Sequence, residues 1–311
     1  MTVGVKLSKE TFAVYVPEKW SSNVHNLPRM RNKDLLVALC ESAQQGTDDA
    51  LSGLDRAVSD EFPNIINHKR VEAQWVFWYR DQAARTSLAS FLEKTPLDQA
   101  NIFNIAPQDK HLTLAVVLQN DGLWLGVHLA AGAVVDRKNL ATKLSKAWER
   151  ERALALFCGL PEGCSIDFDR DMRPATEVDD AFIATLGERL DQGGELLRVG
   201  RHISIDEAVN LGDDLGAHLH TLLLDIVPLY RFIAWSRDND LIDAGKQISE
   251  VKAQKRRQAT AFNSGDKVRF IGGLFSGKQG VVQDVDTKAQ VKVRVGKMSV
   301  VVPGGDLTLA P

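Results

Sequence analysis

The sequence predicts an α+β body followed by a small all-β domain at the C-terminus. The chain has 311 residues, 44% of them hydrophobic and 25% charged, which is an ordinary globular composition. Segments with helical spacing of apolar residues alternate with strand-like runs over residues 1–245. The last 50 or so residues instead carry short alternating strands separated by glycine-rich turns. We therefore expect a mixed or antiparallel sheet in the body and a separate β domain after it.

The first part of the body is predicted to begin with two short strands, 3–7 and 12–16, separated by a turn. Residues 32–62 have apolar side chains at helical spacing, with Gly46 as a break between two helical pieces. The run 71–79 is apolar on both strand faces, so it predicts an interior strand that is covered on both sides. Residues 81–94 are expected to form a helix.

Two apolar runs, 111–118 and 123–130, flank Asn120-Asp121-Gly122 and predict a hairpin. A long helix is expected at 137–157 with Asp136 as its N-cap, followed by a strand at 164–168, a helix at 177–192 and a strand at 195–203. Ser204 and Glu207 fit a capping box at the start of a helix that runs towards Leu224, and Pro228 should break or end that helix. We expect two α+β domains or subdomains, 1–157 and 158–245.

The C-terminal segment is predicted to contain five strands, 266–271, 279–285, 290–295, 297–302 and 306–309. Apolar and polar residues alternate along them, as in a small half-closed barrel filled by its own side chains. The glycines of this segment do not form a nucleotide-binding loop, because Lys278 precedes Gln279 rather than Ser or Thr and the flanks predict strands. The glycines are instead expected at turns and close strand crossings.

Residues 266–286 follow the pattern Gly-Asp-x-Val, a turn, then Gly-x-Phe-x-Gly-x-x-Gly-x-Val and an acidic turn. The segment resembles the KOW motif on this pattern, with Phe275, Gly277, Lys278, Gly280 and Val282 at the expected places. The whole of 263–311 is similar to C-terminal domains of the NusG family of transcription factors, although Leu274 replaces a frequent proline. The N-terminal domain of that family is not recognisable in residues 1–245.

The resemblance implies an SH3-like barrel at 263–311 that binds RNA or a protein of the transcription or translation machinery. In such domains the turn after the first strand and the neighbouring strand form the contact surface. Carried onto this sequence, a protein partner would contact Phe270, Leu274 and Phe275, and Arg269 and Lys278 lie on the same surface. Phe270 and Phe275 are also plausible core residues on the strand pattern alone.

Charge is unevenly distributed along the chain. The net charge is −3, but residues 246–311 contain 12 Lys and Arg against 5 Asp and Glu. Residues 1–245 contain 26 basic and 36 acidic residues, so an acidic body precedes a basic tail. A basic segment can meet a polyanion or simply keep a linker soluble. The candidate nucleic-acid contacts are Lys252, Lys255, Arg256 and Arg257 in the basic linker 246–262, and Lys267, Arg269 and Lys278 in the β domain.

The body offers few catalytic patterns. Asp167, Asp169 and Asp171 alternate and are expected on one strand face, where they would either hold the metal ions of a nuclease or form a solvated strand end. His218 and His220 would point apart on a helix and could not share one metal. Tyr230, Arg231, Phe232 and Trp235 could stack on bases or pack the core. We expect no catalytic residue, no metal and no cofactor.

The sequence thus favours a non-enzymatic binding or adaptor protein that engages RNA or a protein of the transcription or translation machinery. The alternative is a nuclease whose C-terminal barrel holds the substrate. Three cysteines without ligand-like spacing, no secretory signal and no apolar run long enough to span a bilayer predict a cytoplasmic protein that does not enter a membrane. The oligomeric state does not follow from the sequence.

Overall fold

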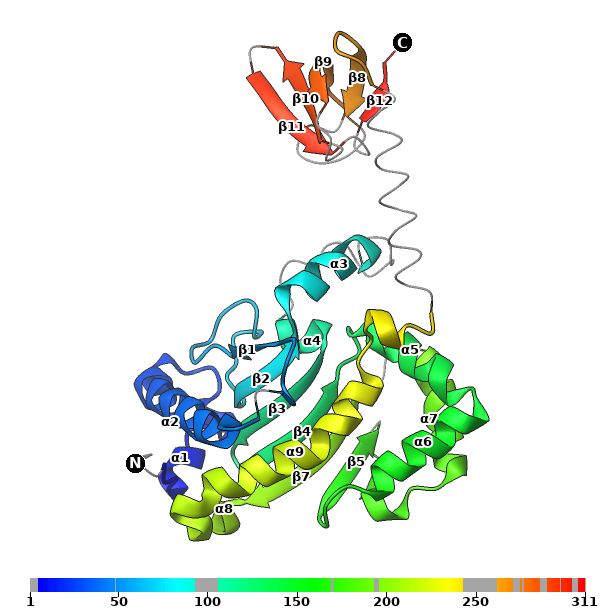
Figure 1. The fold of residues 1–311 in the computed structure, drawn as a ribbon. Coiled ribbons are helices and arrows are strands. Elements are labelled where there is room, and N and C mark those ends of the chain that lie inside the picture. The colour runs from blue at the N-terminus through cyan, green and yellow to red at the C-terminus, as the bar shows by residue number, and fades with distance from the viewer. Residues whose placement is uncertain are drawn as a thin grey trace. The chain divides into compact units, whose positions relative to one another are not determined.

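The computed structural model of the chain divides into two compact units, the body (residues 1–242) and the C-terminal unit (residues 243–311) (Figure 1). The body is described over residues 5–47, 49–92, 106–168, 171–192 and 196–242. The C-terminal unit is described over 262–270, 275, 277–285, 290–296, 298–303 and 307–310. The two units are treated separately below.

The body is built on one seven-stranded antiparallel sheet with the strand order β1-β2-β3-β4-β7-β5-β6. This confirms an α+β body with antiparallel sheet. The sheet joins both halves of the body, since β7 pairs with β4 on one side and with β5 on the other. Residues on either side of 158 therefore share a single sheet. The strands are β1 (Leu54–Val58), β2 (Gln74–Arg80), β3 (Leu112–Gln119), β4 (Gly122–Leu129), β5 (Cys164–Phe168), β6 (Asp171–Pro174) and β7 (Leu197–Ser204).

Helices cover one face of this sheet. Helices α2 (Asn26–Gln44) and α9 (Leu215–Ile233) lie across it, and α5 (Val134–Leu144), α6 (Ala147–Cys158) and α7 (Asp180–Gln192) pack beside them (Figure 1). The other helices are α1 (Lys9–Phe12), α3 (Gln82–Leu92), α4 (Pro107–Lys110) and α8 (Ile205–Leu211). Short 3-10 turns are η1 (Pro17–Lys19), η2 (Asn23–His25), η3 (Ala175–Glu177), η4 (Gly212–Asp214) and η5 (Arg237–Asn239). Within the described residues, none of the helices has the length and apolarity needed to cross a bilayer.

The central strands are buried on both faces, as the apolar run at 71–79 predicts. Val76 and Trp78 of β2 point into the main core under the helices. Phe77 and Tyr79 alternate with them and pack with Trp124 of β4 on the opposite face. The predicted hairpin is also present, because β3 and β4 pair from Leu112–Leu129 through Gln119–Gly122. Ser204 caps α8, its hydroxyl accepting a hydrogen bond of 3.2 Å from the amide of Glu207.

Three predictions for the first part of the body are wrong. The two short strands at 3–7 and 12–16 are absent from the described residues 5–16, where α1 forms instead. Ser8 and Thr11 exchange hydrogen bonds that stabilise this turn, and Phe12 and Tyr15 are buried in the main core. The predicted second helical piece is also wrong, since residues 54–58 form β1 at the edge of the sheet. Gly53 (φ +73°) lets the chain turn into this strand. The spacing of apolar residues alone does not distinguish a helix from a strand over so short a segment.

The predicted helix at 137–157 is two helices, α5 and α6, that meet at Ser145–Lys146. Asp136 does not cap it; it lies inside the first turn of α5 and is almost fully buried. Pro228 does not end its helix, because α9 continues to Ile233. The missing amide leaves the carbonyl of Leu224 without its helical donor, but both residues are exposed to solvent there. The buried face of α9 keeps the helix in place.

The C-terminal unit is a five-stranded antiparallel sheet with the order β11-β10-β9-β8-β12. The strands are β8 (Lys267–Phe270), β9 (Gln279–Val285), β10 (Gln290–Val295), β11 (Met298–Pro303) and β12 (Leu307–Leu309), close to the predicted positions. Val268, Phe270, Val282, Val291 and Val293 form most of a separate core. The strand pattern therefore predicted a small β domain correctly.

Candidate functional site

The exposed face of the C-terminal sheet carries four cations, Lys267, Arg269, Lys292 and Arg294, here called the outer face. Register places them near one another. Val281 of β9 lies opposite Lys267 on one side and opposite Arg294 on the other, and Arg269 lies opposite Gln279. Directly opposite residues in antiparallel strands point to the same side of a sheet. The cations of β8 and β10 therefore project from one surface, about 10 Å apart across β9.

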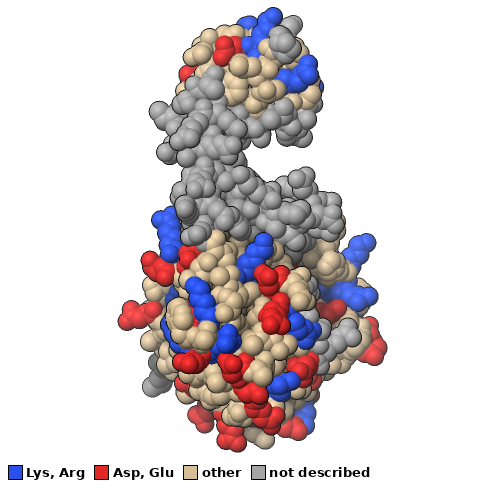
Figure 2. Space-filling model, turned by 90° about the vertical axis from the view of Figure 1, so that its right-hand side faces the viewer, with Lys and Arg blue, Asp and Glu red and all other residues tan. Residues whose placement is uncertain are grey.

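Sequence reasoning had selected Lys267 and Arg269 for this surface but not Lys292 and Arg294. The signal was present, because basic and apolar residues alternate in 290–295 just as they do in 267–270. One carboxylate, Asp284, lies opposite Lys292, and the other polar neighbours are neutral. In Figure 2, blue side chains lie along the top and right of this unit and red ones at its left. The outer face is thus predominantly basic.

The three residues predicted to contact a protein partner do not form one exposed surface in the described part of the chain. Phe270 is 1% exposed and belongs to the core, so it presents no surface to a partner. Phe275 is half-buried; its ring lies 5.7 Å from that of Phe270, and the Lys278 ammonium lies 5.7 Å from the Phe275 ring. Leu274 lies outside the described residues, as do the linker cations Lys252, Lys255, Arg256 and Arg257. Lys278 itself is exposed.

The acidic cluster proposed for a nuclease does not form on one strand face. Asp167 belongs to β5 and Asp171 to β6, with Asp169 outside the described residues. Register pairs Asp167 with Met172 and Phe168 with Asp171, so the two carboxylates point to opposite sides of the sheet. Asp171 is paired with Arg173 at 2.5 Å. The prediction is wrong because the chain reverses direction between the two aspartates.

The other candidate groups of the body have structural contacts. His220 Nδ1 lies 2.8 Å from the carbonyl oxygen of Ala43, which orients its ring towards α2. Tyr230 and Phe232 pack in the main core, and Trp235 is 5% exposed, so none of them offers an open base-stacking surface. No cluster of three potential metal ligands occurs among the described residues.

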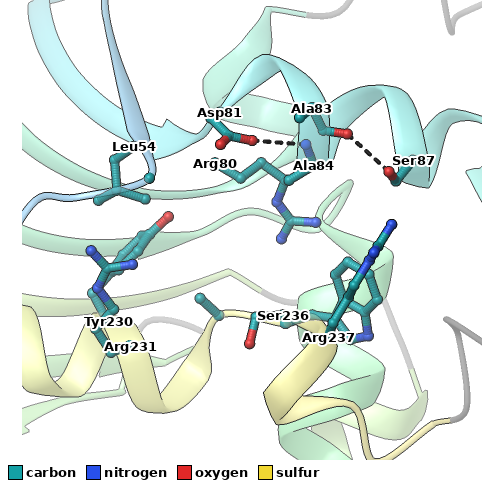
Figure 3. Close-up of a pocket in the computed structure, with 13 residues that line it drawn as sticks. Leu54, Arg80, Asp81, Ala83, Ala84, Ser87, Tyr230, Arg231, Ser236 and Arg237 are labelled. Atoms are coloured by element: carbon teal, nitrogen blue, oxygen red, sulfur yellow. Dashed lines mark hydrogen bonds between the residues drawn. The ribbon is translucent and has the colours of Figure 1, made fainter.

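A pocket of about 400 Å³ lies at the end of the sheet where β2 leads into α3 (Figure 3). Its walls come from the start of β1, the end of β2, the first turns of α3, the last turn of α9 and the segment after it. Three arginines line it: Arg80, Arg231 and Arg237, which gives the name arginine pocket. Sequence reasoning missed this site because its arginines lie up to 157 positions apart.

A buried ion pair forms the base of the arginine pocket. The Arg80 guanidinium donates to Asp136, and the side chains are 7% and 2% exposed. Asp136 also accepts hydrogen bonds from the amides of Trp235 (2.9 Å) and Leu112 (3.3 Å). One carboxylate therefore joins β2, α5, β3 and the end of α9. Burial raises the pKa of the neighbouring Tyr230 phenol, which stays neutral.

The second face of the body sheet holds buried polar groups. Thr113, His128 and Arg198 lie in one row across β3, β4 and β7. Burial, with a smaller contribution from the nearby Arg198 charge, lowers the pKa of His128 to about 3. Arg198 stacks on the Trp124 ring at 4.2 Å. His128 is therefore neutral near pH 7.

No protein-family model matches the chain, and no curated protein shows significant similarity to it.

Proposed function

We propose that the protein is a non-enzymatic RNA-binding protein whose C-terminal unit is a KOW-type, SH3-like barrel. The outer face of that unit contacts the RNA backbone, and the basic linker adds further electrostatic attraction. The observation that carries the proposal is the register that brings Lys267, Arg269, Lys292 and Arg294 to one surface. Phosphate contacts by Lys and Arg supply most of the sequence-independent affinity for nucleic acids.

Three features support a polyanion over a protein as the partner. The outer face holds four cations and one carboxylate, and no ion pair links these groups within the described residues. Its exposed apolar side chains, such as Val301 at 61%, are few, whereas protein interfaces have an apolar centre. Phe270 is in the core, and the half-buried Phe275 ring contacts Phe270 and Lys278, which leaves less of it open to a protein partner.

The arrangement of the aspartates in the candidate acidic cluster favours an adaptor function over a nuclease function. The two described aspartates of the candidate cluster point to opposite sides of the sheet. Two-metal hydrolysis needs carboxylates that converge on ions a few ångströms apart. The body, with its excess of acidic residues, would supply a second specificity instead of binding the RNA backbone.

The test is fluorescence anisotropy with the full-length protein and a labelled single-stranded oligonucleotide, over a salt titration. Arg269→Gln/Arg294→Gln should weaken binding and lower the slope of log affinity against log salt by about 1.4, or about 0.7 for each lost phosphate contact. Both side chains are exposed, so the fold should be kept. Unlabelled duplex DNA and heparin serve as competitors that rank RNA against other polyanions.

The matched control is Arg31→Gln/Lys138→Gln, which removes two exposed cations from body helices and changes net charge equally. This control should bind as the unaltered protein does. Equal loss in both double variants would reduce the effect to overall charge and contradict an outer-face site. Undetectable binding even at low salt would rule out RNA and leave a protein partner at the Phe275 turn as the explanation.

A further inference from the structure

We infer that the arginine pocket of the body binds a small molecule through a phosphate group. This site is separate from the outer face of the C-terminal unit, and the inference does not depend on RNA binding.

Four acceptors that line the pocket already accept hydrogen bonds from the protein. The Gly53 carbonyl accepts from the Asp81 amide at 3.2 Å, and the Arg80 carbonyl accepts from Arg85 at 2.6 Å. The Ala234 carbonyl accepts from the Asn239 amide group at 2.7 Å. The Asp81 carboxylate accepts from the Ala84 amide at 2.8 Å and so caps α3 (Figure 3).

Two donors of lining residues, in contrast, have no hydrogen-bond partner in the described part of the chain. The Nε of Arg80 and the indole Nε1 of Trp235 are buried and have no hydrogen-bond partner in the described residues. Trp235 is 5% exposed and Arg80 6% exposed, so neither donor is satisfied at the protein surface. A buried donor without an acceptor costs about 1–3 kcal/mol, and such groups call for an explanation. Both residues line the pocket, so a side-chain movement on binding would let a ligand that brings acceptors pair with these two donors.

The charges specify that this ligand is an anion. Arg80 is neutralised by Asp136, but Arg231 donates to the uncharged carbonyls of Ala50 (2.8 Å) and Ser52 (2.5 Å). Arg237 is exposed and makes no ion pair within the described part of the chain. Two guanidinium charges therefore face the pocket against the single carboxylate of Asp81. In Figure 3 the Arg80 and Arg237 side chains lie on facing sides of the view, and Arg231 lies beside Tyr230.

Size and geometry favour a phosphate on a small organic body. Guanidinium groups present planar pairs of donors that match phosphate oxygens, and phosphate offers more acceptors than a single carboxylate. A volume of about 400 Å³ lies within the range of small-molecule sites and exceeds what a bare phosphate fills. Leu54 and the alanines of α3 and α9 supply apolar wall for the remainder of the ligand.

The test is isothermal titration calorimetry on the full-length protein in a phosphate-free, low-salt buffer. The probes are inorganic phosphate, ribose 5-phosphate and adenosine monophosphate, with citrate as the carboxylate comparison. Arg237→Gln, an exposed change that breaks no bond within the described protein, should weaken binding about tenfold or more, as expected for one charged hydrogen bond. Arg31→Gln, an exposed change on α2, should leave binding unaltered.

A second measurement reports on the pocket directly. The indole N–H resonance of Trp235, assigned with Trp235→Phe, should shift when a phosphate probe is added, because Trp235 lines the pocket and its surroundings change on binding. Binding should persist in Arg269→Gln/Arg294→Gln, which removes outer-face charge only. No heat and no shift at millimolar probe would overturn the inference. So would binding that is lost in the outer-face variant but kept in Arg237→Gln, or citrate binding more tightly than every phosphate probe.

Discussion

The body and the C-terminal unit are both antiparallel sheets, yet they use their faces differently. The central strands of the body are buried on both sides, under helices on one face and among Phe77, Tyr79 and Trp124 on the other. The strands of the C-terminal unit alternate between a core side and an exposed basic side. A sheet with one exposed face can present a flat binding surface. A sheet covered on both sides leaves binding to cavities at its ends.

This difference also separates the two proposals experimentally. All six tryptophans and all three tyrosines lie in the body, so aromatic fluorescence follows the body alone. The C-terminal unit must be followed by circular dichroism or by its amide resonances.

The largest effect is expected at the buried ion pair of the body. Asp136→Ala leaves the Arg80 guanidinium buried without a counter-ion and should destabilise the body by about 3–5 kcal/mol. Guanidinium denaturation followed by tryptophan fluorescence measures this change. The double variant Arg80→Met/Asp136→Leu removes both charges and should recover much of the loss. If Asp136→Ala is as stable as Arg80→Met/Asp136→Leu, an unpaired buried Arg80 charge is not the cause of the destabilisation.

Acidification should destabilise the body through His128. Its pKa is lowered to about 3 in the folded protein from 6.5, so between these values the unfolded chain binds a proton that the folded chain does not. Stability is therefore fully present above pH 6.5 and is lost as pH falls towards 3. Each pKa unit corresponds to about 1.4 kcal/mol, so the loss amounts to several kcal/mol.

The measurement for this prediction is the denaturation midpoint of the body at a series of pH values. His128→Gln keeps a neutral polar side chain and should flatten the acid limb. His111, whose pKa burial lowers to about 4, retains its own smaller contribution in that variant. Identical pH profiles for the two proteins would contradict a buried neutral His128.

A medium effect is expected at Gly280 in the C-terminal unit. A Cβ there would lie 2.4 Å from Val293 Cγ1 and 2.8 Å from the Arg294 carbonyl oxygen. Gly280→Val should therefore destabilise this unit by about 1–3 kcal/mol through overpacking. Loss of its dispersed amide resonances on heating measures the change, while body fluorescence should not move. Gln279→Val, an exposed change on the same strand, is the control and should be close to neutral.

The smallest stability effect is expected on the outer face. Val301 is 61% exposed and lies opposite Lys292, so Val301→Lys adds a fifth cation to that surface. Unfolding should change by no more than about 0.5 kcal/mol. RNA affinity should rise at low salt and the salt slope should steepen by about 0.7. Unchanged affinity with an intact fold would place the RNA elsewhere.

Local pattern predicted those parts of the molecule whose environment repeats along the chain. The C-terminal strands follow from alternation and turn glycines, since one face meets a core and the other meets water. The β3–β4 hairpin and the Ser204 cap follow from turn and cap chemistry within a few residues. The four outer-face cations needed one step more, because strand pairing brings β8 and β10 to the same surface.

Tertiary packing decided the remainder. Leu54 and Val58 fit helical spacing equally well, and it is pairing with β2 that makes them a strand. Pro228 stays within α9 because the buried face of that helix outweighs one missing hydrogen bond at an exposed turn. Asp167 and Asp171 are separated because the chain reverses between them. They lie on neighbouring strands, and their side chains point to opposite faces of the sheet.

The sequence by itself determined the α+β class, the order of most elements, the basic C-terminal β unit and the acidic character of the body. The arginine pocket was decided only by the tertiary structure. Its charged groups come from β2, α5, α9 and η5, and the pairing of Arg80 with Asp136 spans 56 positions. Helical and strand periodicities describe the neighbours of a residue over a few positions, whereas this site depends on where whole elements pack.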